Sequence, residues 1–264
     1  MFTLPNSVVG REIEPDEQVV DARWLMAYNA ALGELSGEPH PLFPVCYEWP
    51  ATRRLRERAG LAPLDARLVH AQHDLIVHRR PAVEKVRVSG KVVAAIQRRP
   101  GVLVVFRFAT HGDKGDRITT TDFSALYRDV KLDGGDRLIA PVEDPPPHER
   151  KLAPAGEIAV AATAAHVYTE CARIFNPIHT DAAYARAAGL PDIILHGTAT
   201  LALSVSRLVQ DHKEVRRVRC RFSGMVTMPN TLTVHASRDG DDIAFETRNA
   251  AGQAVVERGW VKLG

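Results

Sequence analysis

The segment at residues 198–210 (TATLALSVSRLVQ) constrains the fold more than any other part of the chain. At helical spacing, its apolar stripe consists of Leu201, Ala202, Val205, Leu208 and Val209. Most other positions are Ala, Ser or Thr, so the predicted helix offers little charge to solvent. We therefore expect other elements, in the first place a β-sheet, to enclose it.

Extended segments surround this helix in two groups. Their β-branched and apolar residues are separated by Pro and Gly turns, which favours antiparallel strands. Before the helix they cover residues 70–80, 83–96, 101–110, 117–130 and 158–168, and after it residues 217–226, 231–239, 242–249 and 254–263. An earlier helix is expected at residues 22–32, capped by Asp21 and ended by Gly33, and a charged one at residues 52–59.

Each half of the chain therefore reads as helix and antiparallel meander, which indicates an α+β protein built from two copies of one unit. A segment rich in Pro, Gly and mixed charge separates the halves and is typical of a linker. We expect an N-terminal half at residues 1–140, a linker at 141–156 and a C-terminal half at 157–264. An antiparallel sheet wrapped around one apolar helix is the hot-dog fold, so the prediction is a double hot dog.

The composition excludes several classes of protein. Apolar residues make up 45% and charged residues 25% of the 264 positions, as in ordinary globular proteins, and no apolar run is long enough to span a membrane. Lys and Arg (34) barely exceed Asp and Glu (32), which argues against nucleic acid as the main partner. Cys46, Cys171 and Cys220 are widely spaced, and no signal peptide is evident, so we expect a cytoplasmic protein without disulfides.

A polar turn and a glycine-containing helix entry carry the candidate chemistry. The turn is Asn176-Pro177-Ile178-His179-Thr180-Asp181, and an Ala-rich segment leads from it to Leu195-His196-Gly197-Thr198. This pair of motifs resembles the MaoC-like family of (R)-specific enoyl-CoA hydratases and dehydratases. In that family, Asp-x-Asn-Pro-(apolar)-His precedes an aliphatic-His-Gly turn. The resemblance covers most of the chain and is strongest at residues 166–236.

The resemblance implies addition of water to a trans-2-enoyl thioester, or the reverse reaction. His179 would be the acid/base, and the backbone N–H groups of Gly197 and Thr198 would bind the thioester oxygen at a helix N-terminus. Asn176 would hold the turn or the water, while His196 reads as a structural residue that orders the loop. Coenzyme A would enter as part of the substrate, with no other cofactor, no metal, no nucleic acid and no membrane as partner. A sheet edge or face would allow a homo-oligomer.

The sequence departs from the family motif at one position. Ile174 stands where the family has its catalytic Asp, and isoleucine cannot accept a proton. Glu170, four residues earlier, would share a helical face with it and is the candidate substitute. Asp181 reads as a helix cap instead.

Other residues and functions remain open. Arg217, Arg219 and Arg221 could bind coenzyme A phosphates, although strand alternation favours a solvated face with Val218 and Cys220 inward. The first function is an acyl-CoA hydratase or dehydratase. A non-catalytic acyl-CoA-binding or partner subunit is the alternative, and a thioesterase is a third reading.

Overall fold

The computed structural model describes residues 2–35, 37–209 and 215–264. The chain forms two compact units. Unit 1 comprises Met1–Val19, Tyr47–Arg79 and Glu84–Asp144, and unit 2 comprises Val20–Cys46, Arg80–Val83 and Pro145–Gly264. The division near residue 144 lies inside the expected linker, but residues 20–46 belong to unit 2. The chain therefore passes between the units several times.

Unit 1 consists of a sheet and the helix α2. Its elements are β1 (Phe2–Pro5), η1 (Asn6–Val8), β2 (Glu12–Val20), α2 (Pro44–Arg58, most of it in this unit), η2 (Ala62–Arg67), β3 (Leu68–Val77), β4 (Glu84–Arg98), β5 (Gly101–His111), β6 (Arg117–Arg128), β7 (Val130–Asp133) and β8 (Arg137–Leu138). The strand order is β2-β4-β5-β6-β3, β8 pairs with β4, and β1 pairs with β7. β4, β5, β6 and β3 are joined by antiparallel ladders, so these predicted strands are confirmed.

Helix α2 is longer than the sequence predicted. It was expected at residues 52–59, but it begins at Pro44 and continues through Pro50. Tyr47, Ala51 and Leu55, spaced four residues apart, are fully buried. Burial of this face stabilises a helix that includes prolines, and Pro44 sits in its first turn, where no N–H is needed.

A carboxylic acid is buried in unit 1. The Glu48 side chain extends from α2, and its Oε1 accepts hydrogen bonds from Thr121 Oγ1 at 2.7 Å and from Thr119 Oγ1 at 3.5 Å. Glu48 is only 4% exposed. Burial raises its pKa from 4.5 to about 8, although the two threonine hydroxyls oppose this shift. Glu48 is therefore largely protonated at neutral pH.

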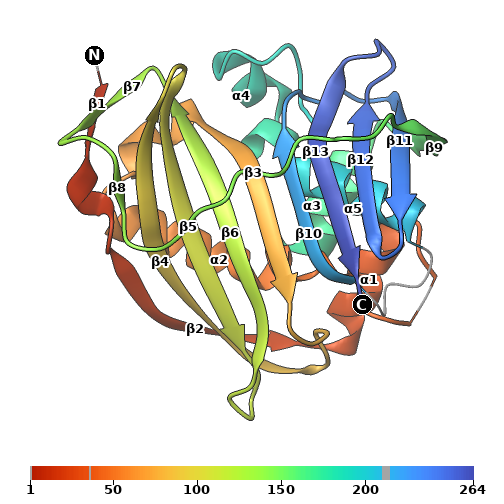
Figure 1. Ribbon diagram of the computed structural model, residues 1–264, viewed down its shortest axis with the longest axis horizontal. Helices are drawn as coiled ribbons and strands as arrows, with labels where there is room; N and C mark the ends of the chain where they lie inside the picture. The colour runs from red at the N-terminus through yellow and green to blue at the C-terminus, as the bar shows by residue number, and fades with distance from the viewer. Residues whose placement is uncertain (1, 36, 210–214) are drawn as a thin grey trace. The chain divides into compact units, whose positions relative to one another are not determined.

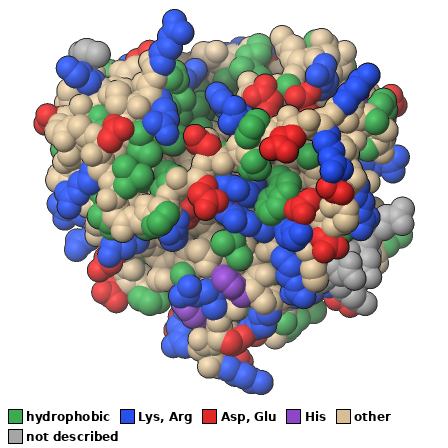
Figure 2. Space-filling model, viewed as in Figure 1, with side chains coloured by type: hydrophobic (Ala, Val, Ile, Leu, Met, Phe, Trp, Pro, Cys, Tyr) green, Lys and Arg blue, Asp and Glu red, His purple; other side chains and the backbone are tan. Residues whose placement is uncertain are grey.

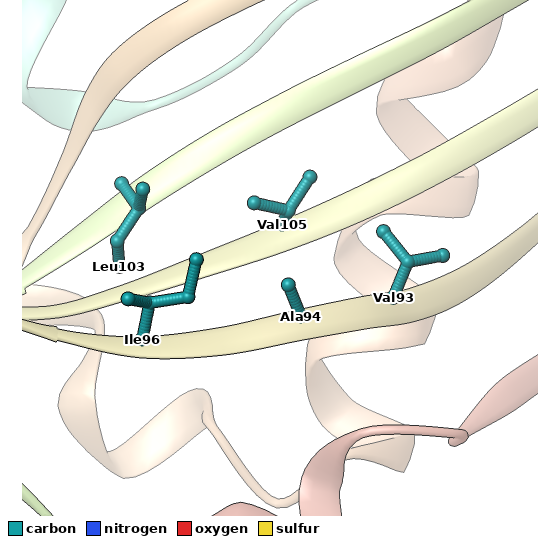
Figure 3. Packing of buried hydrophobic residues seen from close by; sticks show 5 residues of the cluster. All are labelled: Val93, Ala94, Ile96, Leu103 and Val105. Carbon is teal, nitrogen blue, oxygen red and sulfur yellow. The ribbon is translucent and has the colours of Figure 1, made fainter. Parts of the chain in front are cut away.

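The opposite face of the sheet in unit 1 is also apolar. Figure 3 shows five buried side chains on the same side of β4 and β5: Val93, Ala94, Ile96, Leu103 and Val105. Ala140 and Val142 pack against this cluster. Val142, at the start of the segment expected to be a linker, thus helps to cover a sheet face.

Unit 2 is organised around the predicted apolar helix. Its elements are α1 (Ala22–Ala31), β9 (Ala153–Val160), α3 (Ala164–Ala172), η3 (Pro177–His179), α4 (Ala182–Ala187), α5 (Gly197–Leu208), β10 (Val215–Phe222), β11 (Asn230–Asp239), β12 (Asp242–Arg248) and β13 (Ala254–Leu263). The strand order is β10-β13-β12-β11-β9. α5 contacts β9, β11 and β13, and Figure 1 shows α3 and α5 behind this sheet. Leu201, Ala202 and Val205 are fully buried, which confirms the enclosed helix; Gln210 lies outside the described residues.

The strand expected at residues 158–168 is wrong beyond Val160. β9 ends there, and α3 begins at Ala164. Ala165, Tyr168, Thr169 and Ala172 are its buried residues, and their spacing is helical rather than alternating. The alanines in this segment are good helix formers, so local propensity agrees with the observed helix.

The first helix of the chain, α1, belongs to unit 2. Asp21 Oδ1 accepts a hydrogen bond from the Trp24 N–H at 2.7 Å, and Gly33 follows the helix with φ +73°. Both predicted end signals are thus confirmed. α1 packs against α3.

Charged side chains of both signs lie on the face of the molecule that Figure 2 shows. On the face seen in Figure 2, Lys and Arg side chains alternate with Asp and Glu, in keeping with the net charge of +2. Among the described residues, no helix has the length and apolar character needed to cross a bilayer.

Candidate active site

A capped turn fixes the position of His179. Asn176 Oδ1 accepts a hydrogen bond from the Ile178 N–H at 3.4 Å, and Pro177 occupies the first position of η3. Asp181 Oδ1 then accepts from the Tyr184 N–H at 3.0 Å and caps α4, as the sequence predicted. The histidine is therefore held between two helix starts.

The His179 ring is oriented by a backbone carbonyl. Nδ1 lies 2.8 Å from Ile194 O, and the Ile194 N–H donates to Ile178 O at 3.3 Å. Because a carbonyl can only accept, Nδ1 carries the proton and Nε2 keeps a lone pair in the neutral ring. No described residue forms a hydrogen bond with Nε2. Burial lowers the pKa of His179 from 6.5 to about 4, so this nitrogen is available as a base at neutral pH.

A second imidazole lies against the first. The rings of His179 and His196 are stacked, with their centroids 3.6 Å apart and an interplanar angle of 23°. His196 is 3% exposed, and its Nε2 lies 3.4 Å from Thr169 Oγ1. Burial and the neighbouring His179 both lower the pKa of His196. Both rings are therefore neutral near pH 7.

The N-terminus of α5 adjoins this pair. His196 is the N-cap of α5 and accepts the Thr200 N–H at 3.0 Å. The first N–H groups of a helix have no partner within it, so those of Gly197 and Thr198 can bind an oxygen that gains negative charge. A Cβ on Gly197 would lie 3.2 Å from Phe222 Cε1, so an alanine there would require the Phe222 ring to move by a few tenths of an ångström.

A chain of hydroxyl groups supports the start of α5, and no sequence motif predicts this chain. Tyr168 OH donates to Thr198 Oγ1 at 3.2 Å and lies 3.3 Å from Tyr28 OH. Both tyrosines are buried, and the Tyr168 ring lies 4.9 Å from that of His196. Tyr168 is the last residue of the segment predicted as a strand, residues 158–168, and that prediction does not bring it to the start of α5.

The position of the family's carboxylate is occupied by a buried apolar residue. Ile174 is 6% exposed, and its N–H donates to Thr169 O at 3.1 Å. Within the described residues, no carboxylate forms a hydrogen bond or ion pair with His179 or His196. The site thus combines a base and backbone donors without an acidic side chain.

Glu170 is not brought together with His179. It is exposed on α3 and lines a surface cavity of about 280 Å³ with Arg23, Trp24, Ala27, Cys171 and Arg173. The Arg173 guanidinium lies over the Trp24 ring at 4.1 Å. The adjacent Thr169 side chain, by contrast, points to His196.

The arginines of β10 differ in exposure. Arg221 is exposed, Arg217 is half-buried, and Arg219 is only 7% exposed. The expected solvated face of alternating arginines is therefore wrong at Arg219. A register shift between Arg219 and Arg221 interrupts the alternation.

Comparison with known proteins places this geometry in a class. The structure is similar to a MaoC-like dehydratase from Phytophthora capsici, with a TM-score of 0.83, 16% identity and coverage of 97% of this chain and 96% of the other. It is also similar to a double-hot-dog protein of Mycobacterium tuberculosis, with a TM-score of 0.64, 15% identity and coverage of 96% and 95%. The chain has the double-hot-dog fold.

Comparison of the sequence with known families adds to the comparison of folds. Residues 144–258 match the MaoC-like domain family. 3-Hydroxyacyl-thioester dehydratase X of M. tuberculosis is 23% identical over 252 residues, which is 94% of this chain and 86% of that protein. The peroxisomal hydratase-dehydrogenase-epimerase of Saccharomyces cerevisiae is 33% identical over 82 residues, 31% of this chain. The matches span 9% of that protein and 21% of its Neurospora crassa counterpart. The C-terminal part of the chain is a MaoC-like domain.

Proposed function

We propose that the chain is an acyl-CoA hydratase or dehydratase that interconverts a 2-enoyl and a 3-hydroxyacyl thioester. The observation that carries the proposal is the His179 ring, with Nδ1 held by Ile194 O and Nε2 left as a base, beside the N-terminus of α5. The similarity to a 3-hydroxyacyl-thioester dehydratase of M. tuberculosis supports the same chemistry.

In the proposed reaction, His179 Nε2 takes a proton from water as its oxygen attacks the β carbon. The thioester oxygen becomes an enolate, which the N–H groups of Gly197 and Thr198 stabilise at the positive end of α5. The proton then goes to the α carbon. Water supplies all the added atoms and no electrons are left over, so the reaction needs no cofactor. Asn176 keeps His179 in place through the turn.

For the rest of the substrate, we assign the coenzyme A phosphates to Arg217 and Arg221, because guanidinium groups match phosphate oxygens. Arg219 is too buried to serve as a surface ligand. All three cysteines are free, and we propose a reducing compartment such as the cytoplasm. Association into a homo-oligomer is a further expectation.

The test is turnover of trans-2-enoyl-CoA of several chain lengths, followed by loss of the conjugated thioester absorbance and by the mass of the product. His179→Ala should lower the rate at least about 100-fold, since a general base contributes about 10²–10⁴. His166→Ala is the matched control, because His166 is an exposed histidine on α3. No turnover at any length would count against the proposal.

The buried Ile174 favours a second candidate, a subunit that binds acyl-CoA without turning it over. This function predicts saturable binding of acyl-CoA, measured by calorimetry, with neither hydration nor release of free thiol. Release of thiol would instead indicate a thioesterase.

A further inference from the structure

The replacement of the carboxylate changes which reactions the site suits. Hydration requires a water molecule held against the β carbon as well as a group that moves the proton. Ile174 is 6% exposed and presents only methyl and methylene groups, so it cannot hold water. The described part of the site therefore keeps a proton-transfer group and enolate-stabilising donors, and at position 174 it lacks a side chain that could bind water.

These two remaining functions suffice for a reaction that consumes no water. A proton next to an enoyl thioester's conjugated system is acidic when the thioester oxygen is stabilised as a dienolate. One base can remove it and return it to another carbon of the same dienolate.

We propose that the site also interconverts 2-enoyl and 3-enoyl thioesters by proton transfer between the α and γ carbons, with His179 as the single base. Starting from the 3-enoyl thioester, Nε2 removes an α proton, and the C–H electron pair becomes the dienolate bound by the N–H groups of Gly197 and Thr198. The imidazolium then protonates the γ carbon, which moves the double bond into conjugation. Nothing is oxidised, reduced, added or released.

The surroundings of His179 suit a base that takes a proton from the substrate and returns it to the same substrate. Ile194 O fixes one edge of the ring at 2.8 Å, and His196 covers one face at 3.6 Å. The residue is 9% exposed. Limited access of bulk water favours return of the same proton to the substrate over its loss to solvent.

The proposal rests on the proposed function only in requiring the same thioester to bind. The experiment therefore supplies a 3-enoyl-CoA and follows the appearance of conjugated thioester absorbance, with a product of unchanged mass. Hydration of 2-enoyl-CoA is measured in parallel, so failure of one activity is distinguishable from failure of the other. His179→Ala should lower isomerisation at least about 100-fold, and His166→Ala should not.

The second arm restores the carboxylate. Ile174→Asp should raise the ratio of hydration to isomerisation by at least about 10-fold, whereas Ile174→Val should leave it unchanged. Ile174→Asn, which matches Asp in shape without its basicity, separates water positioning from proton transfer. Thermal unfolding shows which of these variants fold. If Ile174→Asp does not fold, the assay of the wild-type protein still decides the proposal. The proposal fails if wild type does not conjugate 3-enoyl-CoA, or if His179→Ala does so at the same rate.

Discussion

Replacing Glu48 with glutamine should remove a large pH dependence of stability from this protein. The Glu48 carboxyl is 4% exposed and its pKa is raised from 4.5 to about 8 by burial. The proton is thus bound more tightly in the folded state than in the unfolded chain. At about 1.36 kcal/mol for each pH unit, the interval between 4.5 and about 8 corresponds to about 5 kcal/mol.

The raised pKa of Glu48 means that the free energy of unfolding decreases as the pH rises. A raised pKa contributes stability that is fully present below 4.5 and is lost as the pH rises through about 8. Glutamine stays neutral and can still accept from Thr121. Glu48→Gln should therefore match wild type within about 1 kcal/mol in acid and exceed it by up to about 5 kcal/mol in alkali.

Urea unfolding at a series of pH values from about 5 to about 9 measures this difference. Glu57→Gln is the control, since Glu57 is exposed on the same helix. As the pH rises, the free energy of unfolding of wild type and of Glu57→Gln should decrease by the same amount, while that of Glu48→Gln stays higher. Parallel curves for wild type and Glu48→Gln would refute the assignment of a buried, protonated Glu48.

Three further predictions concern unit 2. Because the base must be neutral and the pKa of His179 is lowered to about 4, hydration should persist below pH 6.5 and fall only as the pH decreases through about 4; half-loss near 6.5 would contradict this. Tyr168→Phe removes the hydroxyl between Thr198 and Tyr28 and should cost about 1–2 kcal/mol in urea unfolding, with an unchanged midpoint as the contrary result. Asp21→Ala should cost about 1 kcal/mol through loss of the α1 cap, and Asp21→Asn much less; equal losses would show that the cap is not the cause.

The local patterns that predicted the fold correctly were those with one dominant signal. Apart from Arg207, α5 carries no charged residue, so its sequence favoured burial of the apolar stripe. Asp21 and Gly33 mark the ends of α1 by backbone chemistry that is independent of tertiary structure. The first part of α2, before residue 52, was not predicted because its prolines oppose a helix locally, whereas burial of Tyr47, Ala51 and Leu55 stabilises the helix in the folded chain.

The candidate site was predictable to the same extent. The motif placed His179 in a polar turn and Gly197 at the start of a helix, and both elements are present. The contact between the rings of His179 and His196 could not be predicted, because it depends on how the loop before α5 returns to the turn. The exposure of Glu170 depends likewise on which face of α3 is covered.

The placement of α1 has a consequence for anyone who divides this gene. The match to the MaoC-like domain family begins at residue 144, yet unit 2 also contains residues 20–46. A fragment excised at that boundary would lack the Tyr28 ring, which lies 5.7 Å from that of Tyr168. The excised half would therefore expose to solvent the side of α3 that packs against α1. Adding residues 20–46 as a separate peptide should cover that side of α3 again. Unit 2 is thus discontinuous in sequence, and a single cut of the chain cannot separate it from unit 1.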